Sequence, residues 1–391
     1  SSIALVKLGS GSNLLGYYMY HGGSNPEGRL HRLNECQTSP GTANNDLPVV
    51  TYDFQAPLGE FGQPYPQYYM LRPLHLFMHD WGEMLAPMKA SFPVSQDLAK
   101  GDDTQLRWAV RSAKNTQEQG GSGFIFVNNY ERLQQLSVKK NVQLEACGVK
   151  LPKLTVPAGT MAIFPVNIEG IRYATAQLVA KRDGRIYLMQ IPGIPAMIAL
   201  QGGKVLKNVK PRGADTPVYQ NLYLLTRQQA EHLFLDEEQL GRQQLLGNPI
   251  PSLSYTKVRE AGSLRTIQKG RAKVAEAPSE ADWEQAAVYR ISLDELAAPS
   301  VRDSFLLSID YQGDCARLYA DDRLVADNFQ YGRSFLYGLW RLPADVRSLE
   351  LRILPLQPTA PIYLPREADQ TAGEGVKKIT LCQRSFSAQR K

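Results

Sequence analysis

Residues 13–26 read NLLGYYMYHGGSNP, and this stretch determines which fold is expected for the segments around it. Its first half, Leu14–Tyr20, is a short apolar and aromatic run, and its second half consists of turn-forming residues. A run of this length that is rich in tyrosine and closed by a turn is typical of a β-strand. The Gly22–Gly23 pair lets the backbone adopt positive φ and come close to a ligand. We therefore predict a strand over residues 14–20, followed by the kind of polar loop in which α/β enzymes bind ligands.

Helical patterns lie on both sides of this predicted strand. Residues 2–8 have the apolar spacing of a helix, with Gly9 as its stop. A second pattern begins at Pro66, and its apolar stripe consists of Leu74, Phe77, Met78, Trp81 and Leu85. Pro73 removes an interior hydrogen bond, so we expect it to divide this segment into a short helix and a longer one. A helix, a loop and a strand in this order make one αβ step of a barrel.

Beyond Pro93 the pattern changes from helices to short strands. In residues 104–250, apolar segments recur at about ten-residue spacing and are separated by Gly, Pro and Asp, which predicts a β-sandwich. In residues 276–391, apolar segments are joined by tight turns at Gly313–Asp314 and Asp321–Asp322, which predicts a meander and favours a jelly roll. The loop-like residues between these regions predict a domain boundary. The fold class expected is therefore mainly β.

Composition excludes several classes of protein. The chain has 391 residues with 43% hydrophobic content, enough for a large core and for two or three domains. No apolar run approaches the roughly 20 residues that a membrane helix needs. The net charge of +6 is spread along the chain rather than gathered in blocks, so a nucleic-acid partner is not expected. The four cysteines lie far apart without a C-x-x-C pair, so neither a zinc site nor a disulfide framework is indicated.

Two strings carry a family resemblance. Residues 18–25, YMYHGGSN, resemble the last barrel strand of glycoside hydrolase family 35, the β-galactosidases, which is written Y-M-[FY]-x-G-G-T-N. Residues 51–62, TYDFQAPLGEFG, resemble the S-Y-D-Y-D-A-P-L-x-E-x-G string of the same family. Looser similarities follow at residues 123–130 and at residues 309–329. The resemblance is dense over residues 13–85 and loose elsewhere.

The resemblance implies a domain order. Residues 1–92 would be the end of a (β/α)8 glycosidase barrel, comprising its eighth strand, a long loop and its eighth helix. A β-sandwich domain at residues 104–250 and a jelly-roll domain at residues 276–391 would follow. Since the family's two catalytic glutamates lie on earlier barrel strands, we expect them upstream, on a barrel segment in the same or a separate chain.

The resemblance also implies a function. The chain would be part of a retaining β-galactosidase that hydrolyses terminal β-linked galactose from glycans, with a galactoside or glycan as its partner and no cofactor. It would supply part of the sugar pocket and accessory β domains. A periplasmic or secreted bacterial protein is favoured. The residues leave two alternatives open, namely a non-catalytic carbohydrate-binding β-sandwich protein and a structural or assembly module.

Four residues are candidate sugar contacts. By resemblance, Tyr18 and Tyr52 match tyrosines that line the galactose pocket. Tyr18 could instead fill the barrel interior. His21 and Asn25 are further candidates, because imidazole and amide groups bind hydroxyls. A purely structural histidine is an equal alternative at His21, and Ser24 departs from the usual threonine of the family string.

No residue of the sequence is assigned a catalytic or metal-binding role. Glu35 lies in the long loop, where a solvated or substrate-rim carboxylate is expected. Asp53 is expected to hold its loop by accepting backbone N–H bonds, and Glu60 to have a capping or rim role. His75 and His79 are one helical turn apart, a spacing that suits a metal. No third ligand accompanies them, so packing and surface roles are expected.

Overall fold

The computed structural model describes residues 2–30, 32, 48–93, 102–113, 121–132, 134–235, 242–250, 252–270, 275–296, 302–364, 368 and 370–387. The chain divides into two compact units, each built from two stretches of sequence. The first unit comprises Ser1–Tyr18 and Pro66–Asp236, and the second comprises Met19–Tyr65 and Glu237–Lys391. Residues 1–92, which the resemblance groups as one barrel remnant, are therefore shared between the two units.

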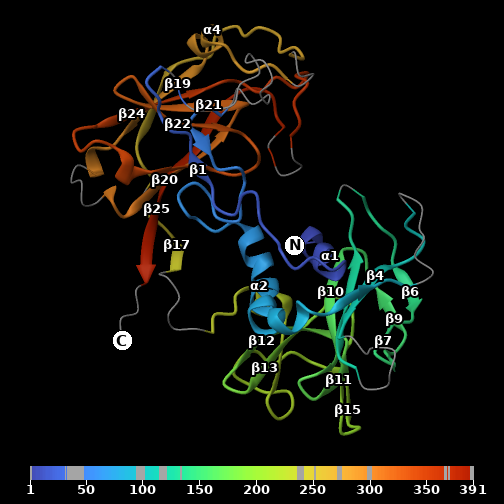
Figure 1. The fold of residues 1–391 in the computed structure, drawn as a ribbon. Coiled ribbons are helices and arrows are strands. Elements are labelled where there is room, and N and C mark those ends of the chain that lie inside the picture. The colour runs from blue at the N-terminus through green and yellow to red at the C-terminus, as the bar shows by residue number, and fades with distance from the viewer. Residues whose placement is uncertain are drawn as a thin grey trace. The chain divides into compact units, whose positions relative to one another are not determined.

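The first unit is built on β-sheets whose strands are mostly antiparallel (Figure 1). The larger sheet runs, from one edge to the other, β15 (Val205–Val209), β14 (Ala196–Leu200), β11 (Ile171–Ala174), β10 (Thr160–Ile168), β5 (Gly123–Asn129), β4 (Arg107–Ser112) and β3 (Lys89–Ser91). The smaller sheet runs β12 (Ala176–Arg182), β13 (Arg185–Gln190) and β16 (Leu222–Leu225), in which β13 and β16 are parallel. Two short ladders join β6 (Lys139–Val142) to β9 (Leu154–Val156) and β7 (Glu145–Ala146) to β8 (Val149–Lys150).

Helices cover these sheets. Helix α1 (Ser2–Gly9) lies against β4, β5 and β10, helix α2 (Pro66–Leu85) lies along β12, and the short helix α3 (Arg227–Glu231) follows β16 (Figure 1). The predicted stripe of α2 is confirmed in its main members, because Leu74, Phe77, Trp81 and Leu85 are all buried. The ring of Phe77 meets that of Phe124 on β5 edge to face, with 5.1 Å between ring centroids.

Pro73 does not divide α2 in two, as the sequence led us to expect. The helix is continuous from Pro66 to Leu85, with Pro73 buried inside it. Proline removes one N–H donor, but the packing of the helix face against the sheet outweighs the loss of one hydrogen bond. The predicted division was wrong.

The strand predicted over residues 14–20 is also wrong. These residues are irregular, Leu14 is 91% exposed and Tyr18 is 80% exposed. A strand exists through hydrogen bonds to a neighbouring strand, and within the described residues no strand pairs with this segment. Regular pairing begins only after it, where β1 (Gly23–Ser24) meets β2 (Thr51–Tyr52).

The second unit contains two larger sheets besides the β1–β2 pair. One runs β17 (Arg242–Ile250), β25 (Gly375–Ser387), β20 (Phe305–Gln312) and β23 (Phe335–Gly338). The other runs β18 (Tyr255–Arg259), β19 (Ala287–Ser292), β24 (Ser348–Ile353), β21 (Cys315–Ala320) and β22 (Arg323–Phe329). Helix α4 (Glu280–Glu284) and the 3₁₀ turns η1 (Asp294–Leu296) and η2 (Leu339–Arg341) complete the unit.

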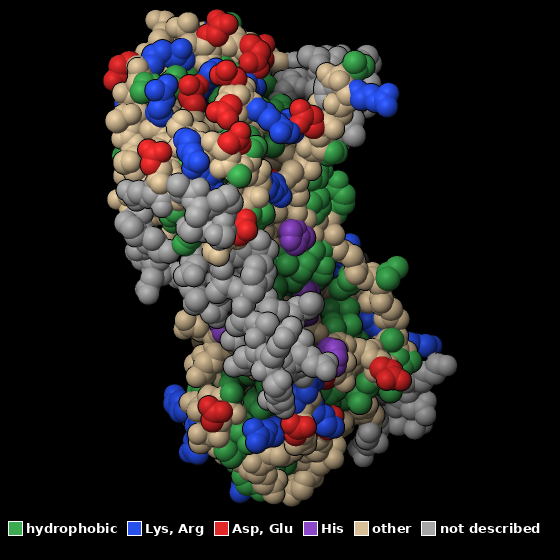
Figure 2. Space-filling view, turned by 90° about the vertical axis from the view of Figure 1, so that its left-hand side faces the viewer, with side chains coloured by type: hydrophobic (Ala, Val, Ile, Leu, Met, Phe, Trp, Pro, Cys, Tyr) green, Lys and Arg blue, Asp and Glu red, His purple; other side chains and the backbone are tan. Residues whose placement is uncertain are grey.

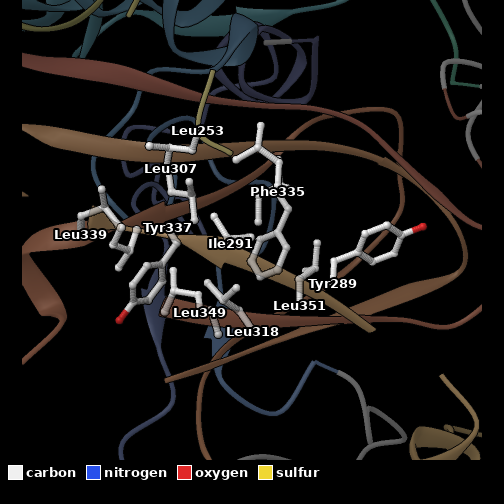
Figure 3. Close-up of a cluster of buried hydrophobic side chains, with 14 of the residues drawn as sticks. Leu253, Tyr289, Ile291, Leu307, Leu318, Phe335, Tyr337, Leu339, Leu349 and Leu351 are labelled. Carbon is white, nitrogen blue, oxygen red and sulfur yellow. The ribbon is translucent and has the colours of Figure 1, made fainter. Parts of the chain in front are cut away.

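Side chains from both sheets form one core (Figure 3). Leu307 on β20 and Phe335 on β23 meet Ile291 and Leu351 from the other sheet, and all four are nearly or completely buried. The predicted turn at Asp321–Asp322 joins β21 to β22 with φ of 47° and 63°, the left-handed values that such a hairpin turn requires. The prediction of a mainly β fold is therefore confirmed.

On the face shown in Figure 2, basic and acidic side chains are interspersed. Among the described helices, none combines the length and apolar character needed to cross a membrane.

Candidate functional site

The second unit contains a cavity of about 730 Å³, within the size range of ligand-binding pockets. All of its lining residues belong to this unit. One wall, which we call the first wall, comes from residues 51–65, and the second wall comes from residues 327–336. Asn25, Pro48, Lys269, Ala275 and residues 361–363 complete the lining.

The cavity brings together two of the four predicted sugar contacts. Tyr52 and Asn25 both line it. Tyr18 belongs to the first unit, and His21 is exposed, with its Nδ1–H donating to the Gly22 carbonyl at 2.5 Å. Neither residue lines the cavity. The strand expected to carry Tyr18 is not formed, and of the two tyrosines only Tyr52 lines the cavity.

Asp53 holds the first wall in shape. Its Oδ1 accepts the Gln55 N–H at 3.1 Å, and its Oδ2 accepts the Glu60 N–H at 2.8 Å and the Tyr65 hydroxyl at 3.3 Å. The expectation that Asp53 accepts backbone N–H bonds is confirmed. Burial raises the pKa of the Asp53 carboxyl, because it outweighs the hydrogen bonds that favour the charged form.

Glu60 is buried rather than placed at a rim, so the rim role expected for it is wrong. It is 9% exposed, and its Oε1 accepts hydrogen bonds from the Ser24 hydroxyl and from the Arg341 Nη1 at 2.7 Å. Its Oε2 accepts the Thr51 hydroxyl at 2.5 Å. Burial raises the pKa of Glu60 despite these partners. Two of the three donors, Ser24 and Arg341, lie 36 and 281 positions away in the sequence, and for that reason the turn around Glu60 gave no sign of its burial.

Asp327, at the edge of the second wall, is a residue that the sequence analysis missed. It is completely buried, and its carboxylate accepts the backbone N–H groups of three consecutive residues, Val49, Val50 and Thr51. This arrangement fixes the start of the first wall against strand β22. The string Ala326–Phe329 was noted only for its family resemblance, and nothing in the string indicated this role.

Aromatic rings and amides face the cavity from both walls. Tyr52 pairs with Phe54 at 5.4 Å between ring centroids, and Phe329 pairs with Tyr331 at 5.5 Å. Phe54 is 50% exposed and Phe329 is 37% exposed, so part of each residue remains accessible to solvent. Flat apolar faces beside amide and hydroxyl groups suit the C–H surfaces and hydroxyls of a sugar. Phe329 and Tyr331 were not predicted as site residues.

The carboxylates of the lining are all engaged in holding the walls. Asp53, Glu60 and Asp327 each accept at least three hydrogen bonds from protein donors. Retaining glycoside hydrolysis requires one carboxyl as acid/base and a second one as nucleophile. Carboxylates fixed in this way act as structural acceptors instead. Glu35 lies outside the described residues.

Each of the two helical histidines contacts a neighbouring polar side chain. The Nε2 of His75 shares a hydrogen bond of 2.9 Å with the Tyr17 hydroxyl, and burial lowers the pKa of His75. The Nδ1 of His79 lies 2.8 Å from the Asp80 carboxylate. Within the part of the chain that the structure describes, no group of three or more His, Cys, Asp or Glu residues is suited to a metal ion.

No protein-family model matches this chain, and comparison with curated protein sequences finds no match either.

Proposed function

We propose that this chain is the carbohydrate-binding carboxyl-terminal part of a retaining β-galactosidase similar to those of glycoside hydrolase family 35. The observation that carries the proposal is that the family-like string at residues 51–62 forms a wall of a cavity lined by aromatic rings and amides. Tyr52, the residue that matches a galactose-pocket tyrosine, lines this cavity together with Asn25.

This chain would bind the sugar, and glutamates of a separate barrel segment would cleave it. The carboxylates of the cavity are held as structural acceptors, so the acid/base and the nucleophile would be the two family glutamates on an upstream barrel segment. In this proposal the β-sandwich lies within the first unit and the jelly roll within the second, and the barrel strand expected over residues 14–20 is not formed by this chain. A galactoside or glycan is the substrate.

A second candidate function is supported by the location of the cavity. Because its whole lining belongs to the second unit, the cavity requires no other segment in order to exist. A non-catalytic carbohydrate-binding protein would need no more than this.

Calorimetric titration of the 391-residue chain with galactose, combined with mass spectrometry of the sample, tests both candidates. Galactose binding is expected in either case, and a chain that binds no galactose would refute the proposal. An additional piece of about 30 kDa that co-purifies and confers hydrolysis would favour the β-galactosidase, since this is roughly the size of the remaining barrel. A lone chain that binds galactosides without any such partner would favour the second candidate.

In the complete enzyme, Tyr52→Phe should mainly lower turnover of a β-galactoside. The substitution removes one oxygen from the cavity lining, and we expect a loss of about 1–3 kcal/mol of transition-state stabilisation. The fold should remain intact because the ring stays in place. Steady-state kinetics and a melting curve measure the two effects. Unchanged kinetics with an unchanged melting temperature would exclude Tyr52 from the site.

A further inference from the structure

The first unit contains a smaller cavity of about 180 Å³, which we call the first-unit cavity. Helix α2, the start of strand β10 and strands β12 and β13 all contribute to its lining, and every lining residue belongs to the first unit. The buried Pro73 of α2 is part of this lining. Because an apolar cavity of roughly 150 Å³ can bind benzene, this one has room for a single six-membered ring with a small substituent.

The apolar lining of the first-unit cavity is rich in sulfur. Three of the eight methionines of the chain, Met70, Met161 and Met189, line it together with the buried Leu74 and Ile191. Methionine is flexible, and its thioether makes favourable contacts with the edges of aromatic rings. This composition therefore favours an aromatic ring as the apolar part of a ligand.

Two nearly buried polar side chains, Gln177 and Thr160, also line the cavity, and each is 5% exposed. The Gln177 Oε1 accepts the Ile163 N–H at 3.2 Å, which fixes the amide and leaves its Nε2 as a donor. Neither this Nε2 nor the Thr160 hydroxyl bonds to a residue that the structure describes. Neither atom is fully enclosed by protein, so both keep surface that a ligand in the cavity can reach.

The charges at the edge of the first-unit cavity compensate each other. The Arg227 Nε donates to the Glu231 Oε1 at 2.8 Å, and both residues belong to the lining. The described lining residues therefore carry no net charge. Since burying a charged group without a counter-charge is costly, this lining favours an uncharged ligand.

We propose that the first-unit cavity binds a small uncharged aromatic alcohol, that is, one aromatic ring that carries a hydroxyl group. The ring lies among the methionines, the hydroxyl oxygen accepts from the Gln177 Nε2, and the hydroxyl proton is donated to the Thr160 Oγ1. One hydroxyl group satisfies both side chains, because it is a donor and an acceptor at once. This inference does not depend on the proposed function, since the two cavities belong to different units and share no lining residue.

Nuclear magnetic resonance of the 391-residue chain, labelled with carbon-13 at the methionine methyl groups, tests the site with benzyl alcohol as the probe. We expect the signals of Met70, Met161 and Met189 to shift together with one dissociation constant. Met84 is the internal control, because it is 42% exposed and does not line the cavity. Toluene should bind about ten-fold more weakly, because it lacks the hydroxyl that pairs with the two polar side chains.

Two variants separate the polar contact from the sulfur contact. Thr160→Val removes the hydroxyl with little change in volume, so it should weaken benzyl alcohol binding about five-fold without weakening toluene binding. Thr256→Val is the matched control, because Thr256 is exposed on β18 and does not line the cavity. Met189→Leu keeps the volume but removes the sulfur, so benzyl alcohol should bind about three-fold more weakly and cyclohexylmethanol about as before.

Several results would overturn the inference. They are unshifted signals of the three lining methionines, an equal shift of Met84, or toluene binding as tight as that of benzyl alcohol. Tighter binding of benzoate or benzylammonium than of benzyl alcohol would refute an uncharged ligand. Circular dichroism establishes whether each variant folds, and if Thr160→Val does not fold, the comparison of benzyl alcohol with toluene on the wild type decides.

Discussion

Asp327 shows how a single buried residue can define a site. Its carboxylate is the common acceptor for the N–H groups of Val49, Val50 and Thr51, and Tyr52 follows directly in the chain. Buried donors that lose their acceptor are costly, because neither water nor another protein group replaces it. The position of the predicted sugar contact Tyr52 therefore depends on a residue of strand β22.

Asp327→Ala should destabilise the second unit strongly. Three backbone N–H groups lose their acceptor, and we expect the free energy of unfolding to fall by about 2–5 kcal/mol. Urea denaturation followed by tyrosine fluorescence measures the change. Asp310→Ala is the control, because Asp310 is exposed on β20 and should change stability by less than about 0.5 kcal/mol. Similar effects for the two variants would contradict the role assigned to Asp327.

The raised pKa of Asp327 should make the folding stability of the chain depend on pH, and the sign of that dependence can be worked out. Burial raises the pKa of this carboxyl in the folded chain. As pH rises above the ordinary value of about 3.9, the unfolded chain loses the proton while the folded chain retains it. The folded state then binds more protons, so stability falls with rising pH until the raised pKa is passed. The stability of the wild type relative to Asp327→Asn should therefore decrease over this window.

Glu27 provides a control of opposite sign for this measurement. The Arg323 hydrogen bond lowers the pKa of Glu27, so the wild type should gain stability relative to Glu27→Gln as pH rises through the lowered pKa. Urea titrations of the wild type, Asp327→Asn and Glu27→Gln are made between pH 3 and pH 7, a range chosen around the ordinary carboxyl pKa of about 4. They measure how the stability of the wild type relative to each variant changes with pH. Slopes of equal sign would show that the folded state does not perturb the two carboxyls in the assigned directions.

At the scale of elements, the sequence correctly predicted the features that depend only on residues close together in the chain. The stripe of α2 follows from helical spacing, and the turn between β21 and β22 follows from two aspartates that tolerate positive φ. The strand over residues 14–20 failed because a strand depends on a partner that no local pattern contains. The predicted division of α2 at Pro73 was wrong for a related reason, since tertiary packing outweighed a local helix-breaking preference.

Arg111 on β4 connects helices α1 and α2 of the first unit to the sheet. It is 1% exposed, and its guanidinium donates to the carbonyls of Leu8 at 2.7 Å, Leu85 at 2.9 Å and Met88 at 2.9 Å. Leu8 and Leu85 lie at the carboxyl-terminal ends of α1 and α2, where carbonyls lack helical partners and a positive charge is favourable. One side chain thus completes two helix ends.

Arg111→Met should therefore destabilise the first unit. The substitution removes the Arg111 donors from the carbonyls of Leu8, Leu85 and Met88, although Leu8 and Leu85 each keep a backbone N–H donor. We therefore expect a loss of about 1–3 kcal/mol in the free energy of unfolding. The control is Arg107→Met on the same strand, whose exposed pair with Glu131 should contribute at most about 1 kcal/mol. Urea denaturation of both variants makes the comparison. Equal losses would mean that Arg111 does not complete the helix ends.

At the scale of the whole molecule, the candidate site could be predicted only in part from the sequence. Asn25 and Tyr52 followed from two short strings and their resemblance, and the role of Asp53 followed from the tendency of aspartate to accept backbone N–H bonds. Asp327 and Arg341 could not be found in this way, because their hydrogen bonds to Val49 and Glu60 span 278 and 281 positions. A mainly β fold brings such distant segments together through sheet pairing, and that pairing is not specified by any single segment.

The most decisive prediction for the whole molecule is that this 391-residue chain hydrolyses no β-galactoside by itself. General acid–base catalysis alone typically contributes roughly 10²–10⁴-fold to a rate, and the carboxylates of the cavity are not free to supply it. Asp53 and Glu60 are both fixed by protein donors on the same wall, whereas retaining hydrolysis needs two carboxyls that face the sugar about 5–5.5 Å apart.

The assay is a nitrophenyl β-galactoside incubated with the pure chain, with mass spectrometry to exclude a co-purified barrel segment. We expect a rate equal to that of buffer. Wild-type activity that disappears in Glu60→Gln or Glu35→Gln would overturn the prediction and would mean that the chain assembles a catalytic pair of its own. Wild-type activity that survives in both variants and follows an added mass would instead identify the barrel segment as the source of the glutamates. The two results assign catalysis to different carboxylates, so the assay locates the chemistry as well as testing for it.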